Sequence, residues 1–171
     1  MKMLAMAFVA ALLVVFPCLG DEASARAMNG TAHDQSNLTA NAWSETHAAY
    51  YAGLSGLNAA QADLIAKWNQ MSQLHRSMCN QWLNAAGGAS DKLIAASSKK
   101  VNGEDCQLDG SDYLAQSDDA LASGYWGTAE SKAGTALELL QEAVTRYFEA
   151  DNLIFAAESL IGQAEAVLSQ Y

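Results

Sequence analysis

Apolar residues recur in a strict seven-residue pattern over the last third of the chain. Alanines and larger apolar residues alternate at steps of three and four, which places both sets on one face of an α-helix. Such a repeat predicts a helix packed lengthwise against another helix, and alanine at one of the two positions lets the backbones approach closely. The predicted helix-packing seam consists of Leu140, Ala143, Tyr147, Ala150, Ile154, Ala157, Ile161, Ala164 and Leu168, with Ala136 extending it toward the N-terminus.

A second long periodic pattern covers residues 39–86. Apolar and aromatic residues follow one another at steps of three or four from Trp43 to Trp82. This predicts one helix of about 45 residues, roughly 65 Å long, which ends at Gly87 and Gly88. Three polar residues interrupt the stripe: His47, Gln61 and His75. Two glycines, Gly53 and Gly56, mark a site where the helix could bend.

The segment between the two patterns predicts shorter elements. We expect short helices over residues 90–100 and 111–123, separated by a loop over 101–110, and a final helix that begins at Thr128 or Thr135. The two long patterns are similar in length and can pair antiparallel. The predicted fold class is all-α: an elongated antiparallel helical bundle of three or four helices, two of them long.

The N-terminus has the features of an export signal. Lys2 precedes an unbroken apolar run, Pro17 ends it, and small residues follow at a spacing suitable for cleavage. The run is short for a membrane span, so we expect a cleaved signal peptide over residues 1–20, with a retained signal anchor as the alternative. Residues 21–38 are polar and predict a flexible leader, and residues 39–171 form the predicted helical-bundle domain. The expected localisation is extracytoplasmic: secreted, periplasmic or cell-surface.

Two cysteines remain after removal of the predicted signal, Cys79 and Cys106. In an exported chain such a pair predicts one disulfide. It would close a loop of about 28 residues and contribute roughly 3 kcal/mol to stability on the chain-entropy model. Two potential glycosylation sites, Asn29 and Asn37, fall in the polar leader.

The charge balance excludes one class of partner. The chain has 9 basic and 19 acidic residues, a formal net charge of −10. Binding of a phosphate backbone requires a basic face, so we expect no nucleic-acid partner. The same charge repels anionic lipid headgroups, and we expect no stable membrane insertion unless the N-terminal segment is retained.

Motifs for catalysis or cofactor binding are missing from the sequence. His47 and His75 lie about 42 Å apart along a continuous helix and cannot share one ion. The segment from Asp105 to Gln116 begins like an EF-hand loop but has Gln116 where a bidentate glutamate belongs. No haem-attachment motif, nucleophile elbow or phosphate-binding glycine loop occurs. We therefore expect neither enzymatic activity, nor a bound metal, nor a cofactor.

The aromatic residues suggest where contacts form. Most of them stand at helical spacing and are expected in the core, whereas Tyr125 and Trp126 lie between two glycines and form a candidate contact patch. Our first hypothesis is an exported, non-enzymatic interaction or structural module that binds an unknown protein or a second copy of itself. The alternative is a carrier that holds a small apolar ligand between its helices, beside Trp68 and Met71. A third option, a metal or haem bundle, requires a helix break near Gly53 or Gly56.

Overall fold

The computed structural model describes residues 21–171, all of them in helices or short connections. The elements are α1 (Glu22–Lys67), the 3₁₀ turn η1 (Trp68–Gln70), α2 (Gln73–Leu83), α3 (Ala89–Ala122) and α4 (Trp126–Leu168). The prediction of an all-helical bundle is confirmed. The predicted signal peptide lies outside the described residues.

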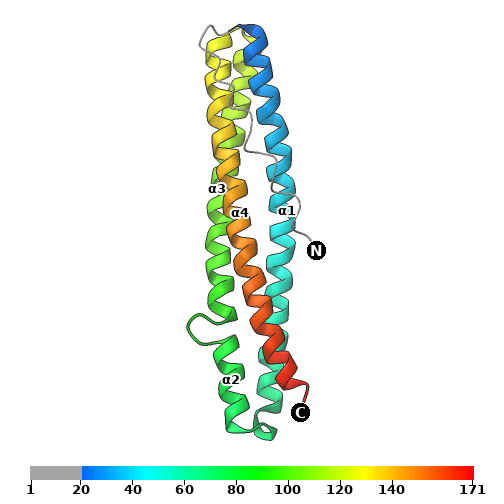
Figure 1. Ribbon diagram of the computed structural model, residues 1–171. Helices are drawn as coiled ribbons and strands as arrows, with labels where there is room; N and C mark the ends of the chain where they lie inside the picture. Colours follow the sequence, from blue (N-terminus) through cyan, green and yellow to red (C-terminus); the bar gives the residue numbers. More distant parts are fainter. Residues whose placement is uncertain (1–20) are drawn as a thin grey trace.

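Three long helices, rather than two, make up the bundle (Figure 1). α1 runs the length of the molecule, α2 and α3 return along it nearly end to end, and α4 runs parallel to α1. α4 packs on both α1 and α3, whereas α1 and α3 touch each other much less. The core therefore follows α4, and one groove, between α1 and α3, is less tightly closed.

Every long helix carries small residues at one core position of its heptad repeat. This position brings the backbones close together, because a small side chain occupies little space between two helix axes. The small residues, all buried, are Ala25, Ala32, Thr39, Thr46, Gly53 and Ala60 on α1, Ala89, Ala96, Gly103, Gly110 and Ser117 on α3, and Ala129, Ala136, Ala143, Ala150, Ala157 and Ala164 on α4.

Large residues of α4 fit over the small residues of α3. A Cβ atom built on Gly103 would lie 2.6 Å from Cε1 of Tyr147, and one on Gly110 would lie 2.9 Å from Cγ of Leu140. The same antiparallel register places Ile154 opposite Ala96. Tyr147 is 1% exposed, and its hydroxyl donates a hydrogen bond of 2.7 Å to Oε1 of Gln107. Burial raises the pKa of Tyr147 well above its usual range, with a smaller contribution from Glu104.

The predicted loop over residues 101–110 is wrong, because α3 continues through it. Asn102 and Gly103 resemble a turn in the sequence, but Gly103 and Gly110 are packing positions that make room for Tyr147 and Leu140. Residues 90–123, expected as two short helices, therefore form one long helix and its C-terminal cap.

The predicted disulfide is also wrong, and the continuous α3 explains why. Cys79 lies on α2 and Cys106 lies on α3, and both are free thiols. Helix α3 alone places about 25 Å between Ala89 and Cys106, whereas a disulfide requires Cα atoms within about 7 Å. Cys79 is fully buried, and burial raises the pKa of its thiol.

Residues 21–38, expected to be a flexible leader, form the start of α1 instead. The side chain of Asp21 caps the helix by accepting a 2.7 Å hydrogen bond from the backbone N–H of Ser24. Ala25, Asn29 and Ala32 are buried against the other two helices. Residues 21–38 therefore belong to the folded domain.

The long helix predicted over residues 39–86 breaks near its lower end, not at Gly53 or Gly56. Met71 adopts an extended conformation between η1 and α2, and its side chain is 3% exposed. The hydroxyl of Ser72 then caps α2 at the N–H of His75. Gly87, with φ of +78°, turns the chain from α2 into α3.

Candidate interaction surface

The alanine-rich seam of α4 is covered by the other helices, and none of its residues is more than 5% exposed. From Ala150 to Leu168 it belongs to the largest core cluster, with residues of α1, α2 and α3. The seam is thus an internal packing surface, and any contact with a partner must use the outer faces of the helices.

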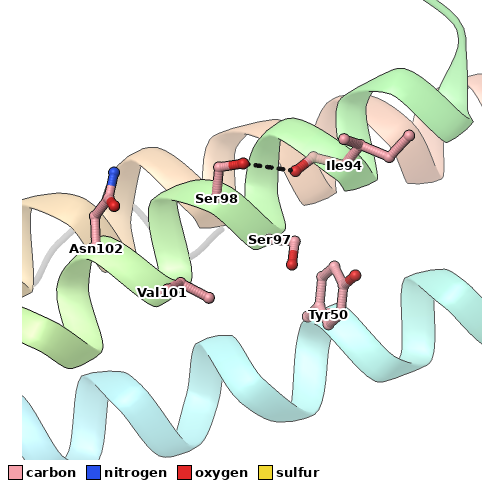
Figure 2. A pocket seen from close by; sticks show the side chains of 6 residues that line it. All are labelled: Tyr50, Ile94, Ser97, Ser98, Val101 and Asn102. Atoms are coloured by element: carbon pink, nitrogen blue, oxygen red, sulfur yellow. Dashed lines mark hydrogen bonds between the residues drawn. The ribbon is translucent and has the colours of Figure 1, made fainter.

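The groove between α1 and α3 contains a hollow lined by residues of both helices. Ile94 and Val101 of α3 line the hollow and are 63% and 47% exposed, and Leu108, 64% exposed, continues their seven-residue spacing beyond it. Tyr50 on α1 faces Ser97 and Val101 across a hollow of about 420 Å³ (Figure 2). We call this surface, with its α3 row of Ile94, Val101 and Leu108, the α1–α3 groove.

Tyr50 lines the α1 side of this groove, and Trp43 bridges it farther along the helix. The rings of Trp43, His47 and Tyr51 follow one another along α1 with centroids 4.8 Å apart at each step. Nε1 of Trp43 donates a 2.7 Å hydrogen bond across the groove to Oε1 of Glu104, which also accepts one from Lys100. Burial works to raise the pKa of Glu104, but these two bonds outweigh it, and the pKa is lowered.

A row of carboxylates lies beside the apolar row on α3. Asp91, Asp105, Asp112 and Asp119 share one heptad position, and all four are exposed. None of them forms an ion pair with any of residues 21–171. Asp105 and Asp112 belong to the segment that begins like an EF-hand loop in the sequence, and its helical backbone is incompatible with such a loop.

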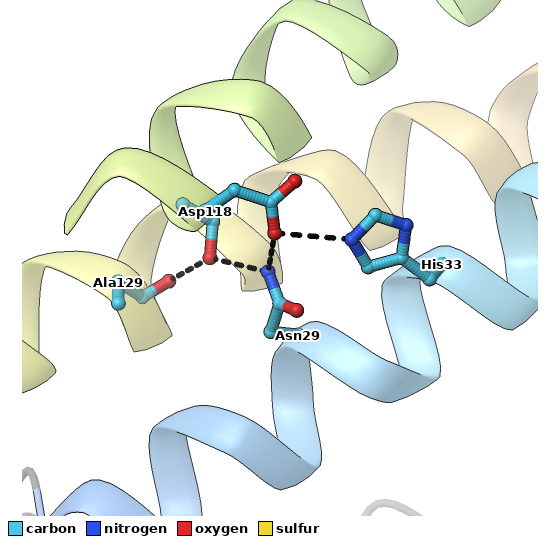
Figure 3. Close-up of polar contacts among 5 residues, drawn as sticks. Asn29, His33, Asp118 and Ala129 are labelled. Carbon is cyan, nitrogen blue, oxygen red and sulfur yellow. Dashed lines mark hydrogen bonds and ion pairs between the residues drawn. The ribbon is translucent and has the colours of Figure 1, made fainter. Parts of the chain in front are cut away.

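A network of polar side chains closes the same groove at its upper end (Figure 3). Nδ2 of Asn29 donates hydrogen bonds to Oγ of Ser117, at 3.0 Å, and to Oδ1 of Asp118, at 2.9 Å. Nε2 of His33 lies 3.0 Å from the same carboxylate oxygen, and Ser117 donates to the carbonyl of Ala129. Burial works to raise the pKa of Asp118, but the bonds with His33 and Asn29 prevail and lower it.

The two potential glycosylation sites differ in accessibility. Asn29 is 8% exposed and its amide is bound to Ser117 and Asp118, so the folded protein has no room for a glycan there. Asn37 is exposed on α1.

The proposed contact patch at Tyr125 and Trp126 is divided by the fold. Tyr125 is 68% exposed at the turn between α3 and α4, whereas Trp126 packs on a small cluster formed by Ala25, Ala120 and Ala129. Only Tyr125 is therefore offered to a partner.

The histidines are kept apart. His47 belongs to the aromatic row in the groove, and Nδ1 of His75 lies 2.7 Å from the hydroxyl of Tyr171 near the other end of the bundle. Within residues 21–171, no three His, Cys, Asp or Glu side chains are grouped so that they could hold a metal ion.

Two features of the surface escaped the sequence analysis. The α3 row was hidden because its central residues fell in the predicted loop, although the seven-residue spacing of Ile94, Val101 and Leu108 was a usable signal. Asp151 is the other: its Oδ1 is buried beside Thr46 without a hydrogen bond of regular geometry. Burial raises the pKa of Asp151. The neighbouring Thr46 hydroxyl lowers this pKa by a smaller amount, and the charge of Glu45 raises it.

Comparisons with known proteins add no relative: no family model, curated protein or solved structure matches this chain. In the part of the chain from residue 21 onward, no helix is long and apolar enough to cross a membrane. The groove and the outer faces of the helices are therefore the surfaces left for a partner.

Proposed function

We propose that this chain is an exported, non-enzymatic interaction module that binds another protein through the outer faces of its long helices. The apolar run at the N-terminus, followed by small residues, supports export to an extracytoplasmic location. The net charge of −10 disfavours nucleic acid and anionic lipid as partners.

The observation that carries the proposal is the row of exposed apolar side chains in the α1–α3 groove. The core of the bundle is already complete without this row, so the fold does not require Ile94, Val101 and Leu108 to be apolar. Exposed apolar surface lowers the solubility of a protein. A contiguous patch of it is typical of an interaction site. Their alignment along a hollow favours an elongated partner.

The alternative function, a carrier for a small apolar ligand, is less well supported. The carrier would need an enclosed space beside Trp68 and Met71. Met71 is instead packed into the core, and the recorded hollow lies in the α1–α3 groove, where most of its lining residues are exposed. The small residues of the seams leave little room between the helices.

Native mass spectrometry of the protein purified from its own source tests the proposal. We expect a stoichiometric protein subunit on the wild type and on Phe155→Asp, a control that alters an apolar side chain 74% exposed on α4. A bare monomer under gentle conditions would contradict the proposal. A bound small molecule in place of a protein would establish the carrier.

A further inference from the structure

We propose that the α1–α3 groove binds an amphipathic α-helix of a partner protein, whose apolar face lies along α3 and whose edge carries lysine and arginine. This inference rests on the proposed interaction function and specifies the chemistry of the partner.

The spacing of the apolar row fits a helix better than a strand or loop. Ile94, Val101 and Leu108 recur every seven residues, so they form a nearly straight line of about 21 Å along α3. A helix laid in a groove presents its anchors at the same spacing, in steps of three, four and seven residues. Tyr50 supplies aromatic surface on the α1 side of the hollow, and its ring contacts that of Tyr51, which is 55% exposed.

The charges beside the row determine which helix is bound. The acidic row of Asp91, Asp105, Asp112 and Asp119 spans about 42 Å along α3 and is interrupted once, at Ser98. Of the three lysines on α3, Lys99 and Lys100 are paired with Glu149 and Glu104. A partner helix with basic residues along one edge would gain charge complementarity at the three carboxylates from Asp105 to Asp119, which favours fast association and the correct register.

A second copy of this chain is a poor occupant of the groove. Most of the cationic side chains among residues 21–171 are already engaged: Arg26, Lys67, Lys99, Lys100 and Arg146 form ion pairs, while Arg76 and Lys132 lie over aromatic rings. Two acidic molecules would repel each other across the same surface. The complementary charge must come from another protein.

Synthetic peptides provide a direct probe. We would prepare two fluorescein-labelled helical peptides of about 25 residues with the same leucine heptads, one flanked by lysine and the other by glutamate. Fluorescence anisotropy against the full chain would measure binding at several salt concentrations. Circular dichroism would verify that each variant retains its helical content.

The variants separate apolar from electrostatic contributions. We expect Val101→Asp to weaken binding of the lysine peptide by about tenfold or more, and Phe155→Asp to change it by less than about twofold. The double variant Asp105→Asn/Asp112→Asn should weaken binding by about three- to tenfold and flatten its salt dependence. Glu158→Gln/Glu165→Gln, which removes two exposed charges from α4, is the matched control.

Several results would overturn the inference. The first is no binding of the lysine peptide, or equal binding of the glutamate peptide. The second is equal loss in the groove variants and in their α4 controls. The third is a concentration-dependent dimer that Val101→Asp abolishes, since a second copy would then occupy the groove. A source-purified complex that survives Val101→Asp would reject this inference while leaving the interaction function standing.

Discussion

Helix α3 meets its two neighbours in different ways. Against α4 it presents Gly103 and Gly110, and the side chains of Tyr147 and Leu140 fill the space so closely that a methyl group would collide with them. Against α1 it packs Leu93 over Gly53 and forms side-chain bridges, such as those from Asn29 to Asp118 and from Trp43 to Glu104. Between these bridges lies a hollow.

The difference separates stability from binding. Close apolar packing contributes most of the free energy of folding and tolerates little change. Partly exposed polar bridges contribute less but fix the position of α1 relative to α3. The bundle can therefore keep an open groove on one side of α3 because the other side holds the helix in place.

The largest expected effect comes from removing the tyrosine that fills the α3–α4 interface. Tyr147→Ala should lower the free energy of unfolding by about 3–5 kcal/mol, because the backbones are too close to collapse further into the cavity. Its neighbour Phe148, 45% exposed, is the matched control, and Phe148→Ala should cost less than about 1 kcal/mol. Urea unfolding followed by circular dichroism measures both, and equal losses would contradict the contrast.

A smaller effect is expected from adding a single methyl group to the same interface. Gly103→Ala should destabilise the protein by about 1–3 kcal/mol, because the Tyr147 ring must move. Gly134→Ala, on a part of α4 with nothing within 4 Å of the new Cβ, should instead stabilise it by about 0.5–1 kcal/mol, since alanine favours a helix. Stabilisation by both substitutions would show that α3 and α4 lie farther apart than described.

On the α1–α3 side, the expected effects are smaller and depend on pH. Because the pKa of Asp118 is lowered in the folded protein, its contribution to stability is present above the unfolded pKa of the carboxyl. That contribution disappears as the pH falls through the lowered folded value. Asp118→Asn should therefore cost up to about 1 kcal/mol at pH 6, since the side chain is about half exposed, and nothing near pH 2. Urea unfolding of both proteins at the two pH values checks this, and a pH-independent cost would point to packing instead.

The smallest expected effect concerns the two cysteines. Since Cys79 and Cys106 are free, a reducing agent should shift the melting temperature by less than about 1 °C. Loss of a disulfide across 28 residues would instead cost roughly 3 kcal/mol, a shift of several degrees. Thermal melts with and without reductant show whether a disulfide stabilises the protein. Labelling of thiols in the unfolded chain gives the number of free cysteines.

Parts of this architecture were predictable because the spacing of apolar residues directly reflects which face of a helix is buried. The repeat of Leu140, Tyr147 and Ile154 with alanines between them predicts a long packed helix, and α4 is one. The continuity of α3 was not predictable, because glycine marks turns and close helix contacts equally well, and only Tyr147 on the opposite helix distinguishes the two for Gly103. The start of α1 was missed because Asn29 is polar at a heptad position and its partners lie about ninety residues away.

The α1–α3 groove depends even more on tertiary structure. Ile94 and Val101 are ordinary core residues when judged by their sequence, and only the register of α3 against α4 turns them outward. A helix can satisfy one heptad pattern in the core and carry a second on its surface, so the apolar count of a segment does not reveal which pattern is buried.

The bonds of Asn29 also bear on the use of its potential glycosylation site. An oligosaccharide is attached to an asparagine amide that reaches the transferring enzyme, and here that amide is occupied once the upper end of the bundle has closed on Ser117 and Asp118. A glycan added to Asn29 before folding would occupy the nitrogen that bonds to Ser117 and Asp118. The mass of the folded chain would therefore show whether that end of the bundle closed before any sugar was attached.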